Sequence, residues 1–363
     1  MNAHRIVIVG GGIIGAAIFQ RLSRAWGREV VMIEKSRPGQ GATAFSGGIV
    51  RAFHLDPLLA DQCAQGLQFY RDLAHASGGE FQIHRTGFLQ LIDEAHHGAA
   101  REAFANLSGQ VALEWMTADA GASRFKLASS QGLCAAVYEP EAGHVDPLSL
   151  ARLLTHMGQR DGGIAMPGVE LRGISTHNGV TCGVETNLGH IVCEQVVVCT
   201  GAWTPELGRR LGVRTPFALR SKAIQINLVS RETQATAMPA FVDLGTDAYG
   251  RPHGADAAFI GCPVDAWDID PDIVSPPRAD ARTDALARAR QRFAWLDNSQ
   301  ALGGYRRHDA YDATGRGVVA WADAPSGVLI AAGFSGNGVK LAPGAAQAVT
   351  RHLQACTELA LPA

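Results

Sequence analysis

Three glycines near the start of the chain have the spacing of a nucleotide-binding turn. Gly10, Gly12 and Gly15 follow a short apolar run and precede an amphipathic segment. The first glycine permits a tight turn, the second lets the backbone approach a pyrophosphate, and the third allows a helix to pack closely on a strand. Glu34 follows about 20 residues later, where a carboxylate accepts hydrogen bonds from a ribose. This pattern predicts a dinucleotide site without distinguishing NAD from FAD.

Two further strand–glycine–helix junctions favour the longer cofactor. Thr200-Gly201 follows the apolar run Val196–Cys199, and the glycine-rich run Gly333–Gly338 follows Val328–Ala332. A single nucleotide domain that binds NAD would not need a glycine turn near the carboxyl end of the chain. A cofactor with an isoalloxazine ring, which touches several strand ends, would need one.

These residues give the chain a resemblance to the D-amino acid oxidase superfamily, especially its glycine oxidase and sarcosine oxidase branches. The matching segments run in the family's order from end to end: Val7–Gly15, Glu34, Gly41–Thr43, Ser46–Gly48, Gly168–Ile174, Cys199–Trp203, Ala331–Lys340 and Pro343-Gly344. The resemblance implies that FAD accepts a hydride from the carbon next to an amine nitrogen. The residues it implies in cofactor binding are Gly10, Gly12, Ile13, Ile14, Gly15, Glu34, Lys35, Ala42, Thr43, Ser46, Gly47, Gly48, Val169, Thr200, Gly201, Trp203, Gly333, Gly336, Asn337, Gly338, Val339 and Lys340.

Two cations are candidates for holding a substrate carboxylate. The chain has few lysines, and Lys340 lies in a glycine-rich apolar run. In sarcosine oxidase-like proteins the lysine of this run helps to bind the carboxylate, and Arg51 matches its arginine partner. Two converging cations would orient an amino acid by charge-assisted pairing. The alternatives are a phosphate contact or surface ion pair for Arg51, and a helix-start lysine that reaches solvent for Lys340.

A second pair of residues competes for the same role. Glycine oxidase-like proteins carry a G-L-R-P segment, which Gly304–Arg307 resembles, and a tyrosine before a proline on a strand. Arg306 and Tyr249 are therefore candidates for binding the carboxylate, and for each residue the alternative is a purely structural role. If all four groups face the pocket, the substrate would carry two carboxylates, as an N-carboxymethyl amino acid does.

The chain also departs from its relatives in ways that affect the cofactor. The cysteine that tethers flavin in sarcosine oxidase falls near Arg307, and the histidine tether of dimethylglycine dehydrogenase relatives falls near Phe45. Neither residue can form that bond, so we expect non-covalent FAD. The oxygen-activating lysine of sarcosine oxidase has no clear counterpart. Lys222 could supply a cation near the ring, and an ordinary edge-strand lysine is the alternative.

The leading hypothesis is an enzyme, an FAD-dependent amino acid oxidase or dehydrogenase acting on a glycine-type, sarcosine-type or other N-substituted amino acid. Its imine product would hydrolyse to an oxo acid plus an amine or ammonia. The main alternative is the catalytic subunit of a heteromeric amino acid or opine dehydrogenase, which passes electrons to a partner instead of O₂. A flavin monooxygenase usually has a G-D motif where this chain has Gly333–Gly336. A non-catalytic flavin-binding protein is the remaining option.

The elements that must position these residues alternate strand and helix at both chain ends. The expected elements are strands at Arg5–Val9, Glu29–Glu34, Val169–Ile174, Val180–Thr186, Ile191–Cys199, Arg220–Leu228 and Val328–Ala332, and helices at Ile14–Ala25, from Asp146-Pro147 to Leu154, Arg282–Leu296 and Pro343–Leu353. They predict an α/β fold, with a Rossmann-like FAD-binding domain interleaved with a substrate domain on a mixed or antiparallel sheet. We assign 1–80, 141–215 and 301–363 to the first domain, and 81–140 and 216–300 to the second.

Composition excludes several partners. The formal net charge of −2 provides no field for nucleic acid, and no apolar run reaches the length of a membrane span. Seven scattered cysteines without a C-x-x-C pair predict no metal site and fit a reducing, cytoplasmic location. The expected partners are a small amino acid with at least one carboxylate, and O₂ or an electron-transfer protein.

Overall fold

The computed structural model describes residues 4–231 and 238–359, so the predicted domain ends at 1–3 and 360–363 lie outside it. Its first sheet has the strand order β17-β18-β11-β1-β2-β8, and β9 and β10 extend it beyond β11. The strands are β1 His4–Val9, β2 Val30–Glu34, β8 Ile164–Pro167, β9 Leu171–His177, β10 Val180–Thr186, β11 Gly189–Val198, β17 Val318–Trp321 and β18 Val328–Ala332. The central strands β18, β11, β1, β2 and β8 are parallel.

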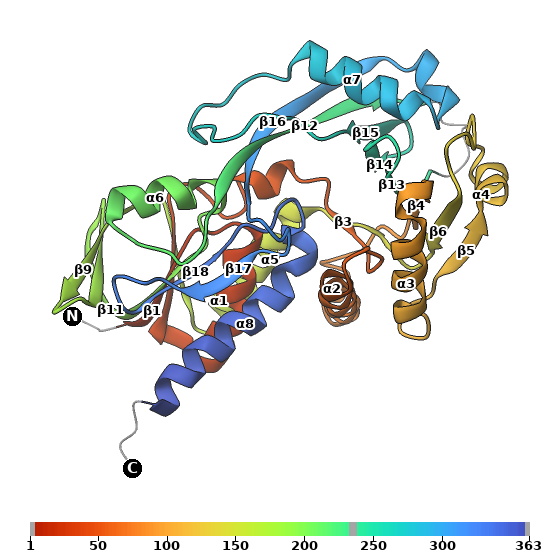
Figure 1. Cartoon of the computed structure of the whole chain (residues 1–363). Helices are drawn as coiled ribbons and strands as arrows, with labels where there is room; N and C mark the ends of the chain where they lie inside the picture. The colour runs from red at the N-terminus through yellow and green to blue at the C-terminus, as the bar shows by residue number, and fades with distance from the viewer. Residues whose placement is uncertain (1–3, 232–237, 360–363) are drawn as a thin grey trace.

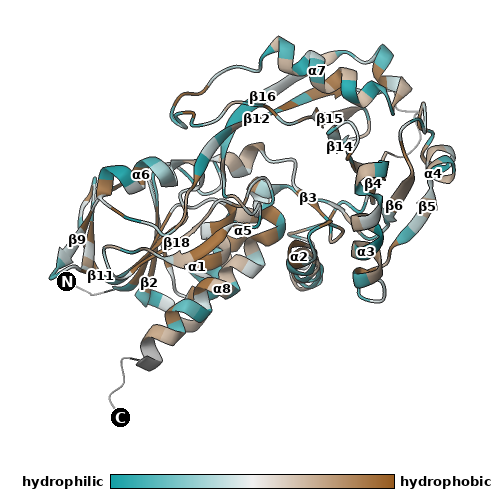
Figure 2. Cartoon of the chain, in the orientation of Figure 1, coloured by the Kyte–Doolittle hydropathy of each residue, from teal (hydrophilic) through white to brown (hydrophobic). Residues whose placement is uncertain are grey.

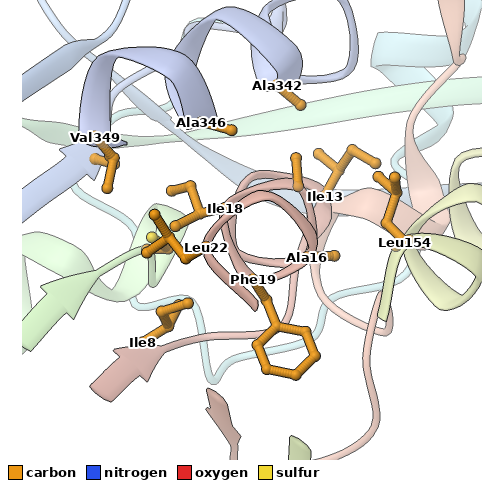
Figure 3. Close-up of a cluster of buried hydrophobic side chains, with 14 of the residues drawn as sticks. Ile8, Ile13, Ala16, Ile18, Phe19, Leu22, Leu154, Ala342, Ala346 and Val349 are labelled. Carbon is orange, nitrogen blue, oxygen red and sulfur yellow. The ribbon is translucent and has the colours of Figure 1, made fainter. Parts of the chain in front are cut away.

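Helices on one face of this sheet bring two helix starts together. Helix α1 (Ile13–Trp26) packs against α5 (Pro147–Arg160) and α8 (Gly338–Leu359). Figure 3 shows its side chains Ile18 and Leu22 directed toward Ile8 of β1 and toward the apolar face of α8. Parallel strands buried on both faces are apolar throughout, which explains why β1 and β18 were recognisable in the sequence.

The second sheet lies in the other half of the molecule (Figure 1), with the order β16-β12-β15-β14-β13-β4-β6-β5. Its strands are β4 Phe88–Ile92, β5 Glu114–Thr117, β6 Ala135–Glu139, β12 Arg220–Ser230, β13 Ala240–Asp243, β14 Tyr249–His253, β15 Ala257–Gly261 and β16 Ala301–Tyr311. Pairing is antiparallel except between β13 and β4. Helix α7 (Ala279–Arg290) covers its outer face and alternates hydrophilic and apolar stretches (Figure 2).

The remaining elements connect the two halves or lie at their margins. Helix α2 (Pro57–Ala76) packs against α8 on one side and α3 on the other. The short strand β3 pairs with β7 between the two sheets. These elements and the peripheral ones are β3 Ile49–Val50, β7 Gly143–His144, α3 His97–Leu107, α4 Ala118–Phe125, α6 Thr204–Leu211, and the short 3-10 helices η1 Gly27–Glu29, η2 Ala42–Phe45, η3 Glu94–His96, η4 Gly201–Trp203 and η5 Ala294–Asn298.

Some predicted boundaries were wrong. The helix expected at Arg282–Leu296 is α7, which ends at Arg290 and is followed by η5. The last helix begins at Gly338 and not near Pro343, although Pro343 has no N–H for the carbonyl of Val339. Tyr70 Oη donates a hydrogen bond to that carbonyl at 2.5 Å, so the helix continues through the proline.

The structure also differs from the predicted division at one boundary. Strand β16 pairs with β12 in the second sheet, whereas the predicted segments place residues 301–311 with the cofactor domain. The division into two domains stays a prediction. Over the described residues, no helix is both long and apolar enough to cross a membrane.

Candidate active site

Four parallel strands end at one edge of the first sheet. Strand β1 lies between β2 and β11, and β18 follows β11, so their carboxyl ends meet there. Strand β2 lies on one side of β1 and strand β11 on the other, and in open α/β sheets ligands bind where the strand order changes direction in this way. Gly10 has φ +101° and donates its N–H to Ile33 O at 2.8 Å. A side chain at Gly10 or Gly15 would collide with the neighbouring backbone.

The segment after β2 packs onto this glycine turn. Thr43 Oγ1 accepts a hydrogen bond from Ile13 N, the first amide of α1, at 2.9 Å. Glu34 accepts from Gly11 N at 2.7 Å and from Ser36 N at 2.8 Å. Thr43 of η2 therefore lies beside the N-terminus of α1, a position that favours anions such as phosphates. The N–H of Val169 donates to Glu34 O at 3.0 Å, which places Val169 beside the predicted ribose carboxylate.

Two other predicted cofactor residues meet at the end of β11. Lys35 Nζ lies 4.1 Å from the centre of the Trp203 ring. Both side chains donate to Asp272 Oδ1 at 2.8 Å. Asp272 belongs to the segment between β15 and α7, so this segment of the second sheet reaches the cofactor edge of the first. Thr200 Oγ1 forms a hydrogen bond with Thr204 Oγ1 at 3.0 Å at the start of α6.

The carboxyl-terminal glycine run completes the edge. Gly333 and Gly336 have φ +79° and +78°. Gly336 N donates to Asp309 Oδ2 at 2.9 Å, and burial raises the pKa of Asp309. Asn337 Nδ2 donates to Gly315 O at 3.2 Å. Gly338 begins α8 close to Ile13 of α1, so the run brings a second helix N-terminus to the same place.

The residues present fit FAD. Two adjacent helix N-termini, close backbone approach at glycines and a carboxylate at the end of β2 suit a pyrophosphate and a ribose. The ends of four adjacent strands, β2, β1, β11 and β18, line this edge, which leaves room for a cofactor larger than one nucleotide. The predicted cofactor residues thus lie on the loops and helix starts at one edge, although their contacts with FAD stay predictions.

Arg51 and Lys340, predicted from distant parts of the sequence, lie in one buried cluster. Burial lowers the pKa of Lys340 to about 8, and the positive charge of Arg51 adds to this effect. The Arg51 guanidinium lies 4.3 Å above the Phe88 ring and donates to Phe53 O and, at 3.4 Å, to Gln90 Oε1. Within the described residues neither cation forms a salt bridge, although the charge of the buried Glu139 acts on Arg51 from a greater distance. The cluster therefore suits an incoming anion.

Two members of this cluster were missed by sequence reasoning. His54 and Cys63 are both buried, and the charges of Arg51 and Lys340 act on both. Cys63 lies one turn before Gly66 on α2, where the backbone of Lys340 leaves no room for a side chain. Burial raises the pKa of the Cys63 thiol to about 11, so this thiol is protonated at neutral pH. The short spacing from Arg51 to His54 was the available signal for His54.

Arg306 and Tyr249 do not face the same space. Arg306 is opposite Gln225 on β12, and the Gln225 side chain bonds the backbone of Arg278 on the α7 side. Tyr249 is opposite Gly261, which is opposite Ile226, so it lies on the other face. The structure therefore separates this candidate pair.

Arginines that were not selected occupy the face of Tyr249. The Arg307 guanidinium lies 3.9 Å from the centre of the Phe45 ring, so the two positions of the relatives' covalent tethers contact each other. Arg251 is buried, donates to Gly47 O and lies 4.4 Å above the Phe259 ring. Lys222 lies 4.4 Å from the Trp267 ring and 5.2 Å from the Tyr311 ring on this same face.

The fold and the site define a dinucleotide-binding α/β protein whose second sheet faces the cofactor edge. The profile of the family described as "FAD dependent oxidoreductase" (DAO) matches residues 5–352, and the chain belongs to this family. FAD is therefore its cofactor.

Named relatives agree with this assignment. The chain is 25% identical to 4-methylaminobutanoate oxidase (formaldehyde-forming) of Paenarthrobacter nicotinovorans, over 94% of the chain and 42% of that protein. It is 24% identical to glycine oxidase of Pseudomonas putida, over 99% and 97%. The structure of L-proline dehydrogenase from P. horikoshii is similar with a TM-score of 0.87 at 21% identity, covering 98% of this chain and 94% of that one. The chain thus spans less than half of the first relative.

Proposed function

We propose that the protein oxidises the C–N bond of an amino acid, with the substrate carboxylate held between Arg51 and Lys340. The observation that carries this proposal is a pair of buried cations, Arg51 and Lys340, that form no salt bridge within the described residues. The charge of the buried Glu139 acts on Arg51 only from beyond salt-bridge distance. Buried charges are costly unless they are paired, and a carboxylate would pair both. Bound FAD would supply the hydride acceptor.

The chain's own residues would act by orientation. Charge-assisted bonds from Arg51 and Lys340 fix one end of the substrate, and the apolar surroundings of Phe88 and Phe53 exclude water. The imine product then hydrolyses to an oxo acid and an amine or ammonia. An N-substituted substrate is supported by the name of the 4-methylaminobutanoate oxidase relative, and a glycine-type substrate by that of glycine oxidase.

Anaerobic titration of the purified, FAD-loaded protein tests the proposal. We expect an N-alkyl amino acid or a simple amino acid to bleach the flavin absorbance, while the corresponding amine without a carboxylate does not. If no amino acid in a broad panel bleaches the flavin, the proposed activity is wrong. Acid precipitation should release the flavin into solution, because Arg307 and Phe45 offer no tether.

The electron acceptor is O₂ or a protein partner. Admitting air after anaerobic bleaching separates the two, since an oxidase recovers its absorbance within a turnover time. Slow recovery in air together with fast recovery on an artificial electron acceptor would favour the dehydrogenase subunit.

A further inference from the structure

A long segment of the second sheet reaches the cofactor edge of the first. Residues 263–278, here called the strap, connect β15 with α7, and Figure 1 shows them as a loop that projects beyond the sheet. The base of the strap is anchored to β12. Arg220 donates to both carboxylate oxygens of Asp268, and Ser221 Oγ donates to Ile269 O at 2.6 Å. The base of the strap is therefore part of the second sheet.

The tip of the strap is bonded to the first sheet instead. Asp272 Oδ1 accepts from Lys35 Nζ and from Trp203 Nε1, both at 2.8 Å. Lys35 Nζ also lies 4.1 Å from the centre of the Trp203 ring, so the three side chains form one cluster. The bonds from Lys35 and Trp203 lower the pKa of Asp272, and its carboxylate is charged at neutral pH. The tip is held in shape because Asp272 N donates to Asp270 Oδ1 at 2.9 Å.

Lys35 and Trp203 meet across the end of β1. Lys35 directly follows β2, and Trp203 ends η4, which comes after β11. Strands β2 and β11 lie on opposite sides of β1, so their ends are about 10 Å apart. The contact between the two side chains therefore spans the carboxyl end of β1, where open α/β sheets bind their ligands. The loops that carry them also approach each other elsewhere, since a side chain at Gly41 would lie 3.7 Å from the Trp203 ring.

We propose that Asp272 is a positioning residue that fastens the strap over bound FAD, so that FAD enters and leaves only while its bonds to Lys35 and Trp203 are open. The proposal depends on FAD binding at this edge and not on the identity of the substrate. The side chains of Lys35 and Asp272 are 42% and 68% exposed. Exposed ion pairs are weak and are screened by salt, so this fastening opens readily enough to allow exchange and closes again afterwards.

The exchange kinetics of FAD test the proposal without any turnover. The release rate is measured by exchange of bound FAD against an excess of radiolabelled FAD. The Kd is measured by dilution of the FAD-loaded protein, and the uptake rate constant follows from the two values. Asp272→Asn should accelerate release about 3- to 30-fold. Because a gate opposes entry as well as exit, uptake should accelerate by a similar factor and the Kd should change little.

Two matched variants separate the fastening from a general change in the strap. Trp203→Phe removes the N–H donor and keeps an aromatic ring, so it should accelerate release and uptake together, as Asp272→Asn does. Asp265→Asn lies on the same strap, where its carboxylate accepts from Trp267 Nε1, and should change neither rate. An unchanged release rate in Asp272→Asn overturns the proposal. Faster release with an unchanged uptake rate also overturns it, because the cluster would then only contact the bound cofactor.

The partnership of Lys35 and Asp272 has its own test. Lys35→Met in the Asp272→Asn background should accelerate release no further, because the ion pair is already absent. Added salt should speed release from the wild type and leave Asp272→Asn almost unaffected. Additive effects of the two substitutions, or equal salt dependence in the wild type and Asp272→Asn, would show that Asp272 does not act through Lys35 and would overturn the proposal.

This proposal and the proposed function fail in different ways. A flavin that no amino acid bleaches overturns the proposed function and leaves the exchange rates as they are. Normal bleaching with wild-type exchange rates in Asp272→Asn overturns only the role of the strap. Should Asp272→Asn disturb the fold of the strap, Trp203→Phe carries the same test, since it leaves the sequence of the strap unchanged.

Discussion

At the scale of single residues, the face on which a cation lies decides its role. Replacing Lys340 by Met or Arg51 by Ala should raise KM about 10- to 100-fold while FAD stays bound, because one charge-assisted contact contributes about 1.5–3 kcal/mol. Steady-state kinetics and the flavin spectrum measure both effects. Arg306→Gln is the matched control, since Arg306 lies on the opposite face of the sheet. An unchanged KM in both Lys340→Met and Arg51→Ala would show that the substrate carboxylate does not bind at this cluster.

The titration of Lys340 predicts how anion binding depends on pH. Its pKa is lowered to about 8, so the side chain is cationic below that pH and neutral above it. The Kd for propionate, followed by the change in flavin absorbance, should therefore rise as the pH increases through about 8. In Lys340→Arg the Kd should stay constant over the same range, because arginine remains protonated. A rise of equal size in Lys340→Arg would assign the titration to another group.

Sequence reasoning found the cations but could not choose between neighbouring arginines. Arg51 and Lys340 could be selected from the sequence because each follows a glycine-containing segment that resembles a motif of the family. For Gly304–Arg307 the sequence has two successive arginines, and a shift of one residue moves a side chain to the other face of a strand. Only the pairing of Arg307 with Ile224 and of Arg306 with Gln225 shows that Arg307 faces the cofactor segment and that Arg306 does not.

At the scale of elements, the contact between α2 and α8 sets the position of Lys340. A methyl group at Gly66 would overlap the carbonyl oxygen of Lys340. Gly66→Ala should therefore push the two helices apart, reduce the free energy of unfolding by about 1–3 kcal/mol, and raise KM through displacement of the Lys340 ammonium. Denaturant unfolding of the FAD-loaded protein and steady-state kinetics measure the two effects.

Gly344→Ala is the matched control for that helix pair. Gly344 lies on α8, and a side chain there would meet open space. The substitution should raise stability by about 0.5–1 kcal/mol, as alanine does inside a helix, without changing KM. Equal effects of the two substitutions would show that close packing at Gly66 does not position Lys340. Helix α2 was not among the helices predicted from the sequence, and its packing against α8 is a long-range contact that periodicity does not reveal.

At the scale of the molecule, the segment from Ser46 to His54 joins the two sheets. It follows η2, whose Thr43 accepts from the first amide of α1, and Gly47 O accepts from Arg251 of the second sheet. It then carries Arg51 over Phe88 of β4 and ends on the Glu139 carboxylate. Arg51 thus lies on the segment that connects the two sheets. Alternating strand and helix patterns in the sequence could not locate this connection.

This connection predicts that a residue outside the substrate contacts controls substrate affinity. Glu139 is fully buried, and both of its oxygens accept from the amides of Ala52 and Phe53. In Glu139→Gln the amide group turns one acceptor into a donor that faces another donor, which costs about 1–3 kcal/mol. The segment should loosen from the second sheet, so that KM rises and the melting temperature falls while the glycine turn retains FAD. Glu141→Gln, a partly exposed neighbour, should change neither. Unaltered KM and stability in Glu139→Gln would mean that the first sheet alone fixes Arg51.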